Sequence, residues 1–240
     1  MDNQEFVRKE RAFKSMLIFG IFSVVMLFAG FTSAYIVSKG FLGEKWITIS
    51  LPTVFQYSTV AIILSSIFAF LSLRSLKKNK IKNTKWHLIA AVLLGLIFSG
   101  FQFQGWSDLI SEGHFFAGKD SNVAASYLYV LTGAHLIHLV AGLIVFLVLL
   151  YNLRLKKYNQ KKHLGFKLGI WFWHFLGILW IYLYGFLLYS TVNNDLKDNK
   201  EFNDVKEMLT NPDVLDDPEE KIIYNKDSYI PQISRCNQRV

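Results

Sequence analysis

The chain has 240 residues, of which 52% are hydrophobic and 16% aromatic, and its formal net charge is +8. The apolar residues gather into long runs between charged loops, a composition too apolar for an ordinary soluble domain of this length. The single cysteine, Cys236, excludes an intrachain disulfide and any cysteine-based metal or redox motif.

Five runs without Asp, Glu, Lys or Arg follow one another along the chain. At about 1.5 Å per residue, a helix of about 20 apolar residues crosses a hydrocarbon layer of about 30 Å. The first run exceeds the core of a signal peptide, about 7 to 15 residues, and further runs follow it, so we expect an uncleaved helix there. The predicted spans are 15–38, 53–73, 86–106, 127–150 and 168–189.

Basic residues are distributed unequally between the loops. The N-terminal segment and the loops after the second and fourth spans carry 4, 6 and 6 Lys or Arg residues, whereas the loops after the first and third spans carry only Lys39, Lys45 and Lys119. The positive-inside rule places the N-terminus in the cytoplasm and, after five crossings, the C-terminus outside. Topology thus explains the net charge, and no nucleic-acid partner is expected. The predicted fold is an all-α integral membrane bundle of five transmembrane helices.

The predicted organisation has three parts: a cytoplasmic N-terminal segment (1–14), the five-helix transmembrane domain (15–190) and an acidic, polar extracytoplasmic tail (191–240). The tail carries eleven acidic against seven basic residues and three of the four prolines. With few large apolar side chains it cannot build a core of its own. We expect it to lie along the outer face of a partner or to remain partly mobile.

Three histidines are the ionisable groups deep in the predicted spans. His135 and His138, three residues apart, share one face of a helix, and Gly142 lies on the same stripe. Polar groups at membrane depth face protein or water rather than lipid, so this face should be covered. Transporters and proton pumps commonly use buried carboxylates or charged relays, which these spans lack.

A membrane b-type cytochrome that uses His135, His138 and His174 is one alternative. Ligation of haem by two imidazoles requires histidines on different helices at similar depth. His138 lies about 18 Å from the inner end of its span, and His174 about 9 Å from the inner end of the fifth. This mismatch disfavours ligation, and no carboxylate is placed to complete a metal site. We therefore predict imidazoles that are hydrogen-bonded within helix interfaces.

The remaining polar, small and aromatic residues of the spans suit contacts between helices. His135 and His138 are expected to fix the fourth span against the fifth or third, and small residues would permit close approach. Tryptophan and histidine side chains are expected to anchor the fifth span. The predicted helix-interface or lipid-cleft residues are Gly133, His135, His138, Gly142, Trp173, His174, Trp180, Gln102 and Trp106.

Two motifs point to a family when they are taken together. The segment Thr132-Gly133-Ala134-His135-Leu136-Ile137-His138-Leu139-Val140-Ala141-Gly142 resembles the Gly-x-His-x-x-His-x-x-x-Gly segment of subunit III of haem-copper oxidases. The segment 173–180 is similar to that family's closing Trp-His-Phe-x-Asp-x-x-Trp segment, 28–35 to its first conserved core helix and 101–106 to its middle one. The resemblance covers about 16–189, in order, as in the five-helix short forms.

The resemblance implies a non-catalytic subunit of a respiratory terminal oxidase, usually cytochrome c oxidase, with quinol oxidase as the near alternative. In that family, subunit III has no cofactor of its own, because haem and copper belong to subunits I and II. It packs against subunit I, holds phospholipid, and supports oxygen access and proton uptake during aerobic electron transport. The implied partners are subunits I and II, further subunits of a respiratory complex and membrane lipids. The implied location is the bacterial inner membrane.

Three positions depart from the family pattern. Carboxylates that the family often carries correspond here to Val24, Gly105 and Gly177. A role for subunit III carboxylates in proton supply therefore does not carry over to this chain. Its support of subunit I would come from packing, lipid and the histidines.

Overall fold

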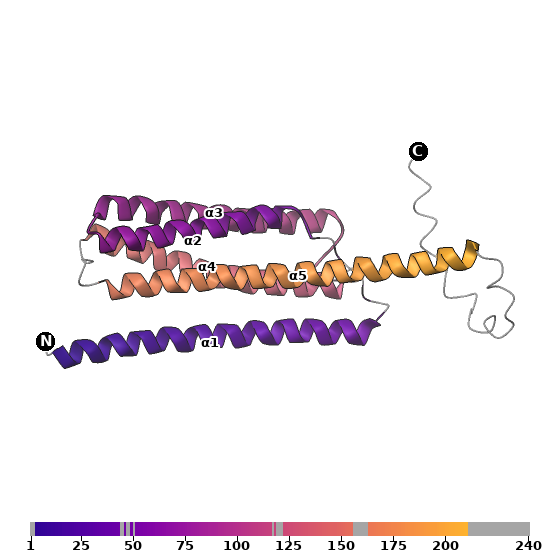
Figure 1. The fold of residues 1–240 in the computed structure, drawn as a ribbon, viewed down its shortest axis with the longest axis horizontal. Helices are drawn as coiled ribbons and strands as arrows, with labels where there is room; N and C mark the ends of the chain where they lie inside the picture. Colours follow the sequence, from indigo (N-terminus) through magenta and orange to yellow (C-terminus); the bar gives the residue numbers. More distant parts are fainter. Residues whose placement is uncertain are drawn as a thin grey trace. The chain divides into compact units, whose positions relative to one another are not determined.

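The computed structural model describes residues 3–43, 46, 49, 51–116, 118, 122–155 and 163–210. This part of the chain forms five helices and no strand. All five are long and apolar enough to cross a membrane, which confirms the predicted helical membrane bundle. The helices, shown in Figure 1, are α1 (Asn3–Leu42), α2 (Val54–Lys77), α3 (Ile81–Ser111), α4 (Val123–Arg154) and α5 (Leu164–Thr210).

The chain divides into two compact units between Thr191 and Val192. The first unit contains the five membrane spans, and the described part of the second is the helical segment 192–210. The basic loop predicted after the fourth span falls largely on 156–162, and most of the predicted tail falls on 211–240. Both ranges lie outside the described residues.

The helices are longer than the predicted spans. α3 continues to Ser111 through residues expected to form a loop, and α1 begins at Asn3 within the segment expected to precede the first span. Hydropathy marks only the apolar part of a helix, and at the start of α1 Glu, Lys and Arg residues with good helix propensity extend the helix beyond that part.

A tight turn joins α2 to α3 because a residue in the left-handed region ends the first helix. Asn79 has φ 57°, and the backbone N–H of Lys80 donates to the Ser75 carbonyl at 3.0 Å. This arrangement satisfies carbonyl groups that the end of a helix leaves unpaired. Gly113, with φ 86°, follows α3 in the same way.

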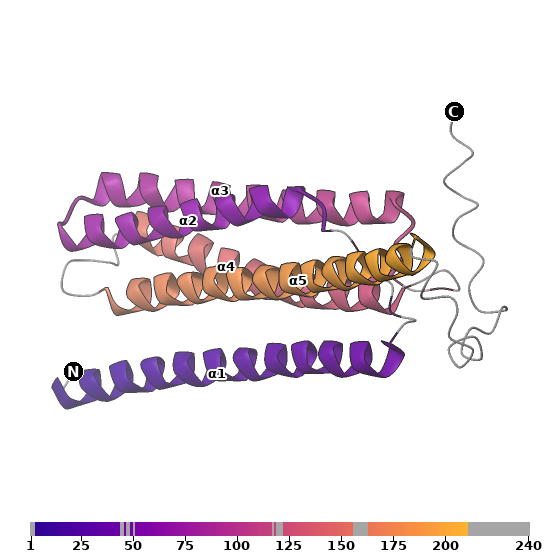
Figure 2. The ribbon, with the colours of Figure 1, turned by 45° about the vertical axis from the view of Figure 1, so that its right-hand side comes forward.

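Two serines of α2 hold that helix against α3. Ser65 Oγ donates to the Ala91 carbonyl at 2.8 Å, and Ser72 Oγ donates to the Thr84 carbonyl at 3.0 Å. Both hydroxyls are buried, and the small side chains let the two helices lie side by side, as Figures 1 and 2 show.

α1 is the least buried of the spans. In its most apolar window 11% of the residues are buried, against 39% in each of the other four. Polar contacts attach its C-terminal half: Tyr35 Oη lies 2.8 Å from Ser190 Oγ on α5, and Ser38 Oγ lies 2.8 Å from Tyr127 Oη on α4. Most of the apolar surface of α1 therefore faces outward, toward lipid or another protein.

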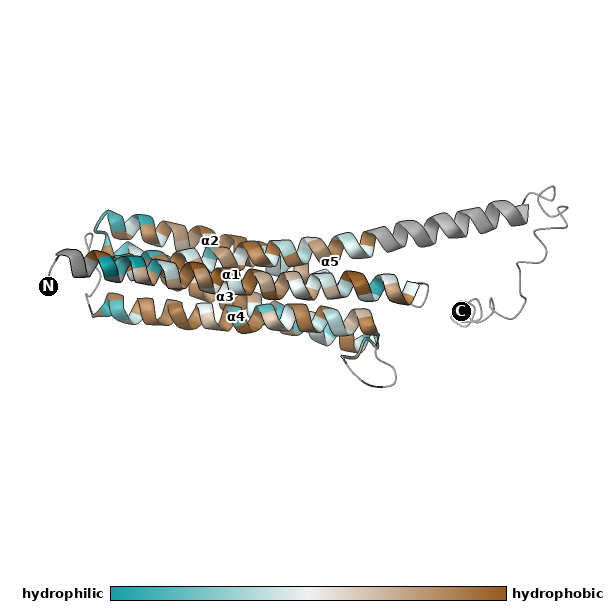
Figure 3. Ribbon diagram, turned by 90° about the horizontal axis from the view of Figure 1, so that it is seen from below, coloured by the Kyte–Doolittle hydropathy of each residue, from teal (hydrophilic) through white to brown (hydrophobic). Residues whose placement is uncertain are grey.

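Hydrophilic residues gather at one end of the bundle. Figure 3 shows them at the start of α1, at the α2–α3 turn and at the end of α4, while the middle of each helix is apolar. The turn between α2 and α3 and the end of α4, which border the two predicted basic loops, thus lie at the same end as the start of α1. Which side of the membrane this end faces remains the prediction of the positive-inside rule.

Candidate functional site

Trp173 lies where four helices meet. Its indole is fully buried, and Nε1 donates to Ser65 Oγ on α2 at 3.0 Å. The ring stacks on Phe146 of α4 with centroids 4.4 Å apart and planes inclined by 30°. Ser65 also donates to the Ala91 carbonyl on α3. The Trp173 side chain thus links α5 directly to α2 and α4 and, through Ser65, to α3.

Two glycines make room for the Trp173 indole. A Cβ added at Gly95 of α3 would lie 2.8 Å from Trp173 Cη2, and one added at Gly142 of α4 would lie 3.1 Å from its Cε3. The ring thus fits between two helix backbones. Gly133 has no such role, because a Cβ there would meet Trp106 at 3.9 Å, an ordinary contact. The close approach expected at both glycines of the α4 motif occurs only at Gly142.

Trp180 occupies a second buried position, two turns further along α5. Its Nε1 donates to Thr59 Oγ1 on α2 at 3.0 Å. The indole meets Phe98 of α3 edge-on, with centroids 5.0 Å apart, and lies 5.2 Å from the imidazole of His135. Trp173 and Trp180 therefore hold α5 in the bundle by the same combination of an indole hydrogen bond to α2 and ring packing.

His135 is packed among aromatic rings. It is fully buried, with Trp180 of α5 on one side and Phe98 of α3 at 6.0 Å on another. Within the described residues, neither ring nitrogen has a hydrogen-bond partner. The expected placement between α4 and its neighbours α3 and α5 is observed, but ring packing takes the place of the expected hydrogen bond.

His138 faces a different neighbour from His135. Its Nδ1 donates to the Ala134 carbonyl of its own helix at 2.7 Å, and its ring lies 5.8 Å from Phe28 on α1. This contact is with α1, whereas the sequence predicts one with α3 or α5. Residues three apart on a helix differ by about 60° in direction, enough here to select different neighbours.

Two of the predicted interface residues near the end of α3 bond across helices. Gln102 is fully buried, and its Nε2 donates to Ser58 Oγ on α2 at 3.0 Å. Trp106 Nε1 donates to Thr132 Oγ1 on α4 at 3.0 Å. These bonds hold the middle helix to both of its neighbours at about the same level along the bundle.

His174 lies at the rim of the bundle rather than in its core. It is half-buried and lines a cavity of about 380 Å³ between α2 and α5, together with Ser66 and Gly177. The rest of the lining is apolar and largely outward-facing. The expected anchoring of α5 thus comes from the two tryptophans, while this imidazole is presented to a lipid-facing cavity.

The histidines do not converge on a common point. His135 faces α3 and α5, His138 faces α1, and His174 faces the cavity beside α2. Across the ranges described, no three His, Cys, Asp or Glu side chains gather closely enough to hold a metal ion. The arrangement is suited to holding helices together.

A family model described as cytochrome c oxidase subunit III matches residues 3–192. The chain belongs to the cytochrome c oxidase subunit III family. This confirms the resemblance drawn from the motifs of α4 and α5. Membership also implies that the chain has a place in a cytochrome c oxidase complex.

Named relatives of this family match the chain to different extents. Cytochrome c oxidase subunit 3 of Thermostichus vulcanus is 29% identical over 184 residues, which make up 73% of this chain and 86% of that protein. Probable cytochrome c oxidase subunit 3 of Mycobacterium leprae is 27% identical over 164 residues, or 68% of this chain and 80% of that protein. Cytochrome c oxidase subunit 3 of Prototheca wickerhamii is 32% identical over 105 residues, which make up 42% of this chain and 37% of that protein.

Gly105 and Gly177 stand where other members of the subunit III family often carry a carboxylate, and in this chain neighbouring side chains occupy the space beside both glycines. A Cβ at Gly105 would come 2.8 Å from the ring of Phe55, which is itself buried. A Cβ at Gly177 would come 3.0 Å from Ser66 Oγ. The Phe55 ring and the Ser66 hydroxyl on α2 thus crowd the positions of these two carboxylates.

Several residues that build the site carry no signal in the sequence. Gly95, Thr59 and Ser65 are neutral residues within apolar runs, and nothing in their spacing marks them. A glycine within a helix lowers the stability of that helix by roughly 1 kcal/mol relative to alanine, so its presence often indicates close packing. This is the one signal by which Gly95 could have been found. The hydroxyl acceptors on α2 appear only once the helices are placed against one another.

Proposed function

We propose that the chain is the non-catalytic subunit III of a respiratory haem-copper terminal oxidase of the cytochrome c oxidase type. The family match over residues 3–192, which takes in all five membrane spans, carries this proposal. Haem and copper reside in partner subunits I and II, where oxygen is reduced. The match to relatives from Thermostichus vulcanus and Mycobacterium leprae over most of their length supports a place in a bacterial inner membrane.

The chain supports subunit I through packing and bound phospholipid, and thereby sustains oxygen access and proton uptake during turnover. The outward face of α1 offers the apolar surface that such packing needs, since Phe19, Phe22 and Met26 are 75%, 64% and 66% exposed. An apolar helix that is so little covered by its own chain requires lipid or another protein around it.

Purification of the full-length chain with an affinity tag, from its native membrane in mild detergent, tests the proposal. We expect haem absorption in the purified material and the peptides of subunits I and II in its mass spectrum. Oxygen consumption with reduced cytochrome c, compared with a quinol, identifies the electron donor and so separates cytochrome c oxidase from quinol oxidase. Purified chain without any haem-bearing oxidase subunit would overturn the proposal.

The same preparation tests the membrane cytochrome b alternative. After the partner subunits are dissociated, we expect the isolated polypeptide to show no haem spectrum, because its imidazoles face different neighbours. A haem spectrum that persists in the isolated chain and is abolished by His138→Ala would favour the cytochrome b alternative instead.

A further inference from the structure

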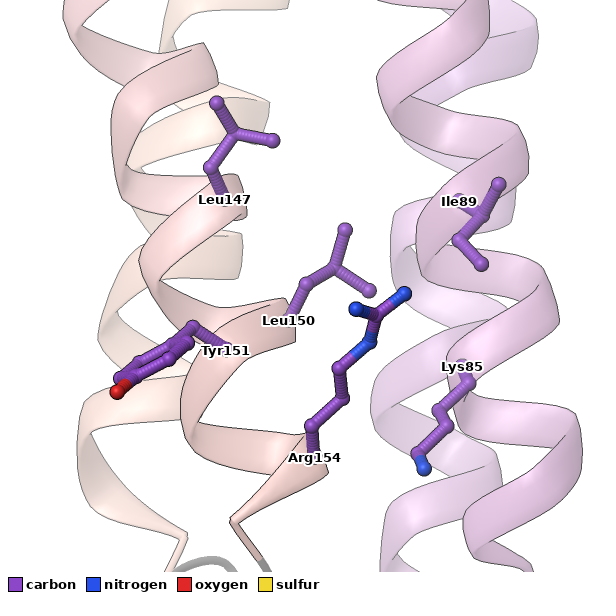
Figure 4. A pocket seen from close by; sticks show the side chains of 6 residues that line it. All are labelled: Lys85, Ile89, Leu147, Leu150, Tyr151 and Arg154. Atoms are coloured by element: carbon purple, nitrogen blue, oxygen red, sulfur yellow. The ribbon is translucent and has the colours of Figure 1, made fainter.

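A cavity of about 280 Å³ opens between α3 and α4 at the basic end of the bundle. None of its lining residues takes part in the contacts described above. Figure 4 shows its lining, which combines two cationic side chains, one phenol and three aliphatic side chains: Lys85, Ile89, Leu147, Leu150, Tyr151 and Arg154.

Within the described residues, the two cations of this cavity have no counter-charge. Lys85 extends from α3, and the guanidinium of Arg154 extends from α4 into the space between the helices (Figure 4). Neither side chain has a hydrogen-bond or ion-pair partner within the described ranges. Two like charges brought to one cavity favour an anion, and an arginine fork can bind two oxygens of a phosphate at once.

The apolar part of the cavity lies nearer the middle of α3 and α4 than the cations do. Leu147 precedes Arg154 by seven residues on α4, which is about 10 Å along the helix axis. On α3, Ile89 lies one turn deeper than Lys85. From the surface inward, the cavity therefore presents positive charge and then hydrocarbon, the order in which a phospholipid presents its phosphate and its acyl chains.

We propose that this cavity binds one anionic phospholipid, with its phosphate on Lys85 and Arg154 and an acyl chain along Leu147, Leu150 and Ile89. The inference deepens the lipid-binding part of the proposed function and rests on it. A free phosphate ion would use the two cations but would leave the aliphatic wall without a ligand. A basic cavity between helices at the cytoplasmic side of a membrane is a recognised setting for an anionic headgroup.

Titration of the full-length chain with phosphatidylglycerol or phosphatidylcholine, followed by native mass spectrometry, tests the cation contacts. We expect the affinity for phosphatidylglycerol to fall roughly fivefold with Lys85→Gln or Arg154→Gln, and roughly 30-fold with both. The charge-conserving pair Lys85→Arg and Arg154→Lys should retain binding. The matched control, Arg74→Gln with Lys82→Gln, removes two exposed charges from the same end outside the cavity and should leave the affinity unchanged.

Leu147→Trp tests the aliphatic wall because it fills the cavity while both cations remain. We expect it to weaken phosphatidylglycerol binding without loss of helical content in circular dichroism. Inorganic phosphate should not displace the lipid. Unchanged binding in the double glutamine variant would overturn the proposal. The proposal would also be overturned if inorganic phosphate displaced the lipid and Leu147→Trp had no effect, because that result would indicate a site for a free anion. Co-purification of oxidase subunits is measured separately from lipid binding. Loss of the lipid site would therefore not contradict the proposed function, and loss of co-purification alone would not contradict the lipid site.

Discussion

Trp173 Nε1 donates a hydrogen bond to Ser65 Oγ at 3.0 Å, and this bond joins α5 to the α2–α3 pair in the interior of the bundle. Hydrocarbon gives helices no hydrophobic reason to associate, so packing and interhelical hydrogen bonds must hold them together. Here both act through one indole, which stacks on Phe146 and fits against Gly95 and Gly142.

Trp173→Phe should lower the free energy of unfolding by about 1 kcal/mol, since it removes the hydrogen bond but keeps an aromatic ring on Phe146. Unfolding of the purified chain in detergent, followed by circular dichroism, measures the change. Trp171→Phe is the matched control, because Trp171 is 51% exposed on the same helix. Equal stability of the two variants would show that the bond to Ser65 contributes nothing.

Gly142→Ala should destabilise the bundle by about 1 to 3 kcal/mol, since its Cβ would come 2.8 Å from Leu176 Cδ1 and 3.1 Å from Trp173 Cε3. Gly133→Ala, nine residues earlier on the same helix, should be neutral or slightly stabilising, because nothing lies closer than 3.9 Å. Thermal unfolding of the two variants side by side measures the difference. The packing described at Gly142 would be refuted by a Gly133→Ala variant that loses as much stability.

The sequence was sufficient to predict the number, order and helical nature of the spans. Long uncharged runs have few alternatives in a bilayer, where every backbone polar group must be paired within the segment. Helix ends were predicted less well, as the continuation of α3 to Ser111 shows, because hydropathy has no information about polar residues that stay helical.

The contacts of individual residues were less predictable than the spans. The sequence pointed to Trp173 and Trp180 but not to their acceptors Ser65 and Thr59, since which serine meets which indole depends on the rotation of α2 about its axis. The same reason explains His138. A helical wheel places it on a stripe with His135, yet the position of α1 decides what that side of α4 touches.

Tyr35→Phe should loosen α1 from the rest of the bundle, because the contact of Tyr35 Oη with Ser190 Oγ at 2.8 Å is one of few polar links to that helix. We expect a broader distribution of distances between spin labels on α1 and α4, measured by electron paramagnetic resonance in a Cys236→Ser background. Tyr57→Phe, in which the parent side chain is 64% exposed on α2, is the control. A distribution as narrow as that of the control would mean that the tyrosine hydroxyl does not fix α1.

His135→Ala should destabilise the bundle by about 3 to 5 kcal/mol, the usual cost of removing a buried ring, because the imidazole fills the space between Trp180 and Phe98. His135→Phe should be tolerated, since it keeps a ring there and removes two buried nitrogens that have no partner within the described residues. Unfolding in detergent and recovery of the assembled oxidase measure both variants. If phenylalanine proved as damaging as alanine, the imidazole would act through a polar contact, and ring packing would not explain its place in the α4 motif.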